Sequence, residues 1–133
     1  MEIILSPIGV IRSPITDLHE GPRQGDESDV SGQLIIEEQY RDALFGLSEG
    51  SMIVILYWMH LAERDIFQVH PRGDRRRPLR GVFTTRSPQR PNPIAFGTVK
   101  VTHIQDTVID VVGLDAVDGT PLIDIKCVPT TGT

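Results

Sequence analysis

The chain has 133 residues, of which 39% are hydrophobic and 23% charged, and its formal net charge is −5. This size and composition are typical of one soluble globular domain, which we predict over residues 1–133. The longest apolar run, residues 52–59, falls short of the roughly 20 residues that a membrane span needs, and the lone Cys127 excludes a disulfide within one chain. The first residues lack the basic region of a signal peptide, so we expect a cytoplasmic protein without a membrane partner.

Basic residues are concentrated in one segment. Eleven of the 13 are arginine, and residues 64–90 contain eight arginines and two aspartates, which gives this segment a charge of +6 and leaves −11 for the rest. Such a separation indicates a basic face suited to phosphate or another polyanion. A solvated loop that pairs with acidic residues in a dimer has the same pattern, so charge alone leaves both interpretations open.

Short elements are predicted in the N-terminal third. Apolar and β-branched residues at 3–5 and 8–11 predict a strand that Pro7 interrupts, which favours an edge or a bend. Residues 33–37 predict another short strand, and residues 38–45 a helix of about two turns.

The middle of the chain contains its most hydrophobic stretch. Residues 52–59 are continuously apolar and rich in β-branched side chains, which predicts a strand buried on both faces at the centre of the core. Residues 81–85 predict a further strand, after which Pro88, Pro91 and Pro93 prevent regular pairing.

The C-terminal third predicts a hairpin and one more strand. Residues 95–104 and 107–114 form the hairpin, Asp118 and Gly119 a turn, and residues 122–128 the last strand. About seven strands, one clear short helix and no βαβ spacing predict a mainly all-β fold. We expect a small closed or strongly curved antiparallel β-barrel with one or two short helices, and not a Rossmann fold.

The proline-rich segment is the first candidate site. Three prolines in residues 88–93 restrict the backbone, so polar side chains held there lose little entropy on binding a ligand. Arg86, Arg90 and Asn92 belong to this segment, and the planar guanidinium suits a carboxylate or a phosphate. The alternative is a proline-stiffened connection between two strands.

Two further clusters have weaker signals. His60 follows the hydrophobic strand and is expected to bond a ligand or a backbone carbonyl, with a neutral core histidine as the alternative. The chain has no HExxH or CxxC spacing, so we predict no metal site. The turn at residues 118–120 either caps its own backbone amides or holds a small polar ligand.

Six motifs together resemble the TrmO family of tRNA methyltransferases, also called TsaA-like proteins. They are PIGVIRSP at 7–14, PRQG at 22–25, LYWMH at 56–60, HPRGD at 70–74, residues 81–94 and residues 113–126. The most specific is TRSPQRPNP at 85–93. The motifs occur in the family's order and span nearly the whole chain.

The resemblance implies transfer of a methyl group from S-adenosylmethionine to N6 of threonylcarbamoyladenosine, next to the anticodon of threonine tRNA. It also implies a small β-barrel, usually a homodimer with the cofactor near the interface. Two alternatives remain: a non-catalytic RNA-binding module, and a methyltransferase for a different acceptor.

Site residues follow from the same resemblance. The expected cofactor contacts are Pro22, Arg23, Gln24, His60, Arg86, Asp118, Gly119 and Thr120. The expected tRNA contacts are Arg72, Arg75, Arg76, Arg77, Arg80, Arg90 and Asn92. Asp115 or Asp124 is the candidate that accepts a proton from the exocyclic amine. Tyr57 and Trp58 alternate on a strand, so only one of them faces the site, and the sequence does not decide which.

Overall fold

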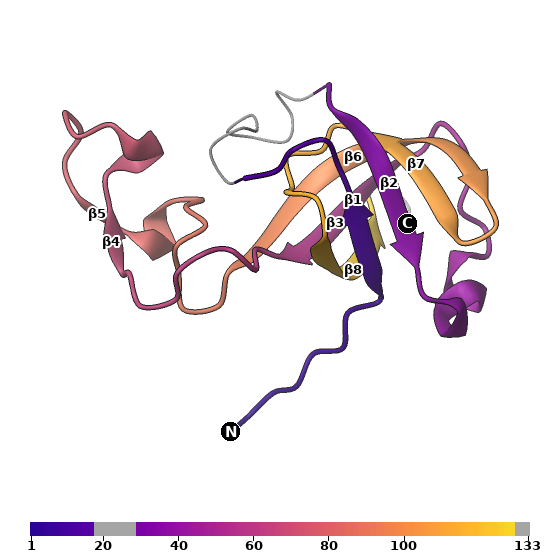
Figure 1. Ribbon diagram of the computed structural model, residues 1–133, viewed down its shortest axis with the longest axis horizontal. Coiled ribbons are helices and arrows are strands. Elements are labelled where there is room, and N and C mark those ends of the chain that lie inside the picture. The colour runs from indigo at the N-terminus through magenta and orange to yellow at the C-terminus, as the bar shows by residue number, and fades with distance from the viewer. Residues whose placement is uncertain (18–28, 130–133) are drawn as a thin grey trace.

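A closed six-stranded antiparallel barrel forms the body of the protein (Figure 1). The computed structural model describes residues 1–17 and 29–129. The barrel strands are β1 (Gly9–Arg12), β2 (Ser31–Ile36), β3 (Met52–Trp58), β6 (Ile94–Gln105), β7 (Val108–Val112) and β8 (Thr120–Cys127). Around the barrel their order is β1-β2-β7-β6-β3-β8. The predicted all-β barrel is therefore confirmed.

Short elements lie outside the barrel. They are the 3-10 helix η2 (Glu38–Leu44), the strand pair β4 (Gln68–Val69) and β5 (Arg80–Gly81), and the 3-10 turns η3 (Pro71–Gly73) and η4 (Val82–Thr84). The helix predicted at residues 38–45 is thus a 3-10 helix. The strand predicted over residues 81–85 is wrong, because pairing ends at Gly81 and Arg90 helps to hold the next residues in a turn. Residues 3–5 have no regular structure either.

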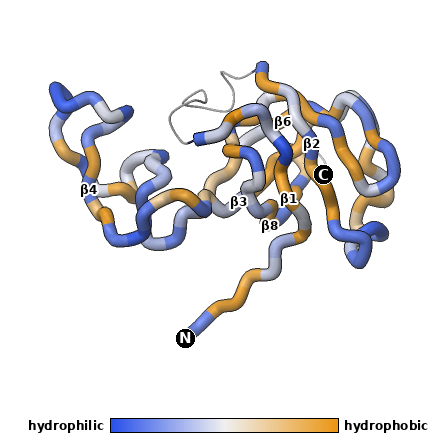
Figure 2. Tube along the Cα trace, viewed as in Figure 1, coloured by the Kyte–Doolittle hydropathy of each residue, from blue (hydrophilic) through white to orange (hydrophobic). Residues whose placement is uncertain are grey.

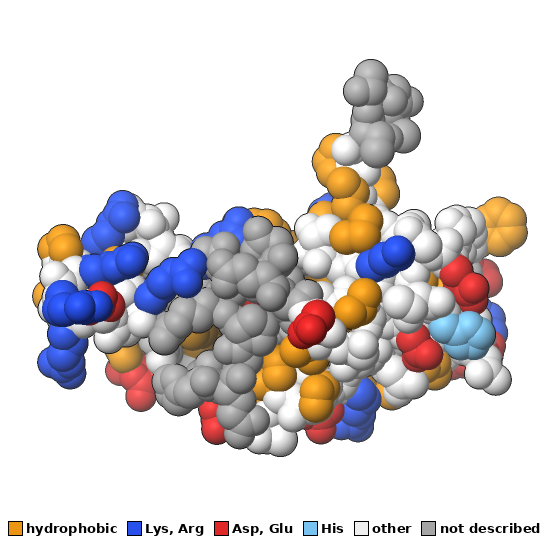
Figure 3. Space-filling model, turned by 90° about the horizontal axis from the view of Figure 1, so that it is seen from above, with side chains coloured by type: hydrophobic (Ala, Val, Ile, Leu, Met, Phe, Trp, Pro, Cys, Tyr) orange, Lys and Arg blue, Asp and Glu red, His pale blue; other side chains and the backbone are white. Residues whose placement is uncertain are grey.

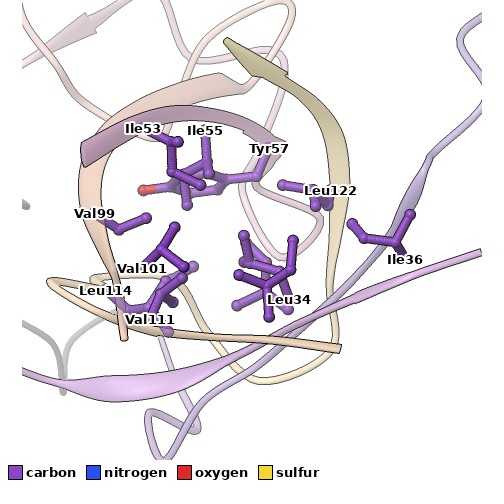
Figure 4. Packing of buried hydrophobic residues seen from close by; sticks show 13 residues of the cluster. Leu34, Ile36, Ile53, Ile55, Tyr57, Val99, Val101, Val111, Leu114 and Leu122 are labelled. Atoms are coloured by element: carbon purple, nitrogen blue, oxygen red, sulfur yellow. The ribbon is translucent and has the colours of Figure 1, made fainter. Parts of the chain in front are cut away.

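The core fills the inside of the barrel (Figure 4). Ile53, Ile55 and Tyr57 point inward from β3, whereas the side chains that alternate with them face outward and are exposed or partly buried. The prediction that this strand is buried on both faces is wrong, because its outward apolar side chains have no second layer over them. Alternation of this kind is typical of an antiparallel barrel strand, and Figure 2 shows hydrophobic residues along several barrel strands.

The two ends of the barrel are closed differently. β2 and β3 lie on opposite sides of the ring, so the connection that contains η2 crosses one end, where Tyr40, Leu44 and Leu47 pack against the core. β7 and β8 also lie opposite each other, and residues 113–119 cross the other end. At this second end β1 and β3 finish and β6 begins, and we call it the site end.

Residues 60–93 project from the site end (Figure 1). We call residues 65–85 the arginine lobe, and residues 59–64 and 86–93, which join it to the barrel, its neck. The Met59 amide donates to the Pro93 carbonyl at 2.8 Å, and the Glu63 amide donates to Oε1 of Gln89 at 2.5 Å. The topology therefore places the proline-rich segment between the lobe and the mouth of the barrel. In the described part of the chain, no helix has the length and apolar character to cross a membrane.

Candidate functional site

A buried tyrosine and a carboxylate meet at the site end. The Tyr57 side chain is 4% exposed, and its hydroxyl donates to Oδ1 of Asp115. Asp115 lies in the crossing connection between the buried Leu114 and Ala116, and is half-buried. Burial raises the pKa of Asp115, while the Tyr57 hydrogen bond and the charge of Arg86 pull it back. The carboxyl group is therefore held near the surface in a partly dehydrated place.

Arg86 extends the same site outward. Its guanidinium lies over the Phe96 ring, with its central carbon 4.7 Å from the ring centroid. The Phe96 side chain is 54% exposed, so this stacked pair faces solvent. Within the described residues no carboxylate comes within 4 Å of Arg86, although its charge acts on Asp115. A planar guanidinium whose N–H groups have no acceptor among the described residues suits an incoming carboxylate or phosphate.

Asp124 points away from this site. Tyr57 pairs with Leu122, but the preceding residue Leu56 pairs with Asp124, so Ile123 is an extra residue in β8. Such a bulge switches the side-chain alternation, and it turns Asp124 to the outside of the barrel. The carboxylate there lies 3.9 Å from the Lys126 ammonium and lines a hollow beside η2. The structure therefore does not bring Asp115 and Asp124 together.

The turn at residues 118–120 is fixed to the end of β1. The Ser13 amide donates to Oδ1 of Asp118 at 3.1 Å, and the Gly119 amide donates to the Ile11 carbonyl at 2.8 Å. Gly119 has φ of +84°, and the buried Thr120 hydroxyl donates to the Val117 carbonyl at 2.6 Å. The Asp118 carboxylate therefore accepts from the end of β1 and not from an amide of its own turn, and the turn adjoins the connection that contains Asp115.

The proline-rich segment is held from inside by Arg90. Its guanidinium donates to the carbonyls of Val82 and Thr85, the latter at 2.8 Å, and its Nε is buried with no hydrogen-bond partner among the described residues. These contacts fix the turn that immediately precedes Arg86. A contact between Arg90 and RNA stays a prediction.

Arg64 is a neck residue that the sequence interpretation did not single out. Its Nε donates to the Pro91 carbonyl at 2.6 Å, and its Nη2 donates to Oδ1 of Asn92 at 3.2 Å. The same guanidinium stacks on Trp58, 5.1 Å from the ring centroid. Trp58 therefore faces the neck, and Tyr57 is the residue of this pair that faces the interior.

The arginine lobe presents a group of exposed cations (Figure 3). They are Arg72, Arg75, Arg76, Arg77 and Arg80. Asp74 organises part of the group: its carboxylate accepts from the Arg76 amide and guanidinium at 3.0 Å, which holds its pKa below the ordinary value. The His70 ring also bonds the Arg77 carbonyl at 2.7 Å. Hydrogen bonds within the positive segment therefore hold its backbone and part of its arginine surface in a defined conformation.

The remaining predicted residues have different outcomes. His60 is exposed in the neck, so the alternative of a buried core histidine is wrong. Pro22, Arg23 and Gln24 lie outside the described residues, but residues 13–17 and 29–30 on either side of that segment are at the site end. Across residues 1–17 and 29–129, no three His, Cys, Asp or Glu residues form a group able to hold a metal ion.

Sequence reasoning missed three contributors: Phe96, Arg64 and the inward direction of Tyr57. Strand periodicity shows only that Tyr57 and Trp58 face opposite sides, and the continuously apolar sequence of residues 52–59 does not show which of them points inward. Phe96 is recognised only through the position of Arg86 over its ring. Arg64 gave no signal of its own, since nothing in the sequence shows that it folds back to residues 91–92.

Comparisons with known proteins agree with this architecture. Residues 10–130 match the family model described as tRNA-methyltransferase O N-terminal domain. A probable S-adenosyl-L-methionine-binding protein of Methanothermobacter thermautotrophicus is 46% identical over 95% of this chain and 90% of the relative. An S-adenosyl-L-methionine-binding protein of Archaeoglobus fulgidus is 44% identical over 93% of this chain and 88% of the relative.

A solved structure has the same fold. The crystal structure of TrmO from Pseudomonas aeruginosa superimposes with a TM-score of 0.78 at 30% identity, covering 97% of this chain. The chain spans 57% of the length of that TrmO chain. The sequence match over nearly all of the barrel and lobe shows that the chain belongs to the tRNA-methyltransferase O N-terminal domain family.

Proposed function

We propose that this protein is an S-adenosylmethionine-dependent methyltransferase that acts on N6 of threonylcarbamoyladenosine next to the anticodon of threonine tRNA. Its family and its S-adenosylmethionine-binding relatives support the methyltransferase assignment. The observation that carries the rest is the position of Arg86: it is stacked on Phe96, acts on the half-buried Asp115, and belongs to the segment that joins the barrel to the arginine lobe. A tRNA substrate is consistent with action in the cytoplasm.

The residues present fit the methyl donor. S-adenosylmethionine has a carboxylate, and Arg86 offers a guanidinium whose donor edges face solvent within the described structure. His60, the turn at 118–120 and residues 22–24 are the further proposed contacts. When bound, S-adenosylmethionine supplies a methyl group on a sulfonium: the exocyclic nitrogen bonds the methyl carbon, the carbon–sulfur bond breaks, and the N6 proton leaves.

We propose Asp115, and not Asp124, as the group that takes this proton. Asp115 is close enough to Arg86 for the charge of the guanidinium to lower its pKa, whereas the bulge at Ile123 turns Asp124 to another face. Because burial raises the pKa of Asp115, its carboxylate is a stronger proton acceptor than an exposed aspartate. Alignment of the two reactants by the neck contributes further, since methyl transfer depends strongly on orientation.

The arginine lobe is the proposed tRNA surface. Arg72, Arg75, Arg76, Arg77 and Arg80 are exposed on it, and guanidinium groups bind phosphates strongly. Asn92 is a further proposed contact at the neck, whereas the Arg90 guanidinium is directed to carbonyls of its own loop. The target base must leave its stack to reach Asp115, and anticodon loops are single-stranded, so this costs less than opening a duplex.

A homodimer is the proposed assembly. The outer barrel face exposes Met52, Ile94 and Phe96, and the lobe has an apolar hollow of about 310 Å³ lined by Phe67, Gly81, Val82, Phe83 and Pro91. Apolar surfaces of this kind are typical of protein interfaces. The outer barrel face that contains Phe96 adjoins Arg86. A second copy bound to this face would therefore lie beside the proposed S-adenosylmethionine site.

The test is methylation with defined components. Purified protein, S-adenosylmethionine and threonine tRNA that contains threonylcarbamoyladenosine should give the methylated nucleoside by mass spectrometry, and tRNA that lacks the threonylcarbamoyl group should not. Arg86→Ala should weaken S-adenosylmethionine binding about 10-fold to 100-fold in calorimetry, since it removes charge-assisted hydrogen bonds. Arg75→Ala is the matched control.

The alternatives give different results. Tight donor binding without product on the verified tRNA would mean a different acceptor. Salt-sensitive tRNA binding without donor binding would mean a non-catalytic RNA-binding module.

A further inference from the structure

Among the buried residues of the core cluster that the structure describes, Tyr57 is the one with a polar atom on its side chain. Of the 13 buried residues in this cluster, the other 12 are aliphatic. Figure 4 shows the Tyr57 ring among these aliphatic side chains, with its hydroxyl oxygen at the edge of the group. Phenylalanine would fill nearly the same volume, so packing alone does not explain the hydroxyl.

The hydroxyl has a specific partner. It donates to Oδ1 of Asp115, which comes from a different part of the chain 58 positions away. Tyr57 is fixed by the barrel, because β3 pairs with β6 on one side and with β8 on the other. Asp115 is in a connection without strand pairing of its own. The hydrogen bond therefore restricts the orientation of the Asp115 carboxylate relative to the barrel.

Two titratable groups act on Asp115 within the described structure: Tyr57 from β3, and Arg86 from the segment after η4. Both favour its ionised form, whereas burial opposes it. Burial and the charge of Asp115 together raise the pKa of Tyr57 well above its ordinary value, so the tyrosine remains a hydrogen-bond donor across the working pH range.

We propose that Tyr57 is a positioning residue, whose hydroxyl holds the Asp115 carboxylate in the orientation that accepts the N6 proton during methyl transfer. The inference rests on the proposed function. Tyr57 touches neither reactant, since its side chain lies inside the barrel behind Asp115. It acts through the orientation and the proton affinity of that carboxylate.

The variant Tyr57→Phe tests this. We expect kcat to fall about 10-fold, which is part of the roughly 10²–10⁴-fold acceleration that a positioned general base contributes. The dissociation constant for S-adenosylmethionine should change less than about two-fold, because Tyr57 does not contact it. Loss of the hydrogen bond disfavours the carboxylate, so the acidic limb of the kcat profile should move to higher pH. Tyr40→Phe, at the opposite end of the barrel, is the matched control and should leave kcat and the profile unchanged.

Combination with Asp115→Asn shows whether Tyr57 acts through Asp115. If it does, the double variant is no slower than Asp115→Asn alone, because the removed hydroxyl has no base left to orient. Multiplicative losses in the double variant would overturn the proposal, as would a Tyr57→Phe enzyme with the rate and pH profile of Tyr40→Phe.

A measurement without catalysis separates this inference from the proposed function. Carboxyl ¹³C resonances followed over pH should show a higher pKa for Asp115 in Tyr57→Phe than in the unmodified protein. An unchanged titration would overturn the inference even in an active enzyme. A shifted titration in a protein that binds S-adenosylmethionine but methylates no verified tRNA would support the Tyr57 contact and contradict the proposed acceptor.

Discussion

Single arginines in this protein have different roles that their sequence positions do not distinguish. Arg86 and Arg90 belong to one proline-rich segment, yet Arg86 faces solvent over Phe96 while Arg90 turns inward to two backbone carbonyls. The difference arises from the turn at η4, whose carbonyls converge on one side. A motif with two arginines therefore contains one residue suited to a ligand and one that holds the loop.

Substitution of Arg90 should distinguish these roles. Arg90→Ala removes charged hydrogen bonds to the Val82 and Thr85 carbonyls, so we expect the free energy of unfolding to fall by about 2 kcal/mol. Both hydrogen bonds come from Nη2, so Arg90→Lys, which keeps a terminal cationic donor, should retain more stability than Arg90→Ala. Chemical denaturation measures both.

Arg75→Ala is the control, because that side chain is exposed on the lobe, and its unfolding midpoint should not move. If Arg90→Ala instead kept full stability and only weakened tRNA binding, Arg90 would contact RNA and would not stabilise the loop.

Among the elements, β1 and β2 are in close backbone contact at two glycines. A Cβ built on Gly9 would lie 2.1 Å from the Ile35 carbonyl oxygen, and one on Gly32 would lie 2.2 Å from the Arg12 carbonyl oxygen. Backbone atoms cannot move aside as a flexible side chain does. The glycine of the PIGVIRSP motif is thus required by strand packing.

Gly9→Ala should therefore destabilise the barrel. Separation of β1 from β2 or a shift in register is expected to cost about 1–3 kcal/mol of unfolding free energy, as for other overpacked sites. Gly81→Ala, where the added methyl meets nothing within 4 Å, should be neutral. Thermal unfolding of the two variants is the measurement, and equal midpoints would contradict the close approach.

Elements were predictable from the sequence where the pattern was regular. The hairpin of β6 and β7 and the last strand follow from alternation and turn residues, and the structure has both. The bulge at Ile123 was not predictable, because the extra residue depends on pairing between β8 and β3 and not on local preference. The bulge turns Asp124 outward, and its place in β8 separates it from Asp115 in the crossing connection, although the sequence left the two equivalent.

At the scale of the molecule, the barrel topology gathers the site. The connection with Asp115, the end of β3, the start of β6 and both neck segments all meet at one end, while η2 closes the other. Three parts of the chain, near residues 57–63, 86–96 and 113–119, are thereby brought together by the order of the strands around the ring. The sequence predicted the barrel but not the order of its strands, so it named candidate residues without showing which ones meet.

The same arrangement separates charge within the molecule. The arginine lobe is positive and projects from the barrel, where most acidic residues lie (Figure 3). If phosphates bind this lobe, affinity for tRNA should depend on charge at that place and not on net charge alone. The double variant Arg76→Ala with Arg77→Ala removes two cations from the lobe, and Lys100→Ala with Lys126→Ala removes two from the barrel.

Only the lobe variant should weaken tRNA binding, by about 10-fold at moderate salt, and reduce the slope of log affinity against log salt by about 1.5, as expected for two lost phosphate contacts. S-adenosylmethionine affinity should not change, because Arg86 lies at the neck, outside the group of exposed lobe cations. Binding titrations at several salt concentrations measure the slope. Equal losses in both double variants would mean that tRNA responds to the overall field of the protein, and the lobe would then have no special role in recognition.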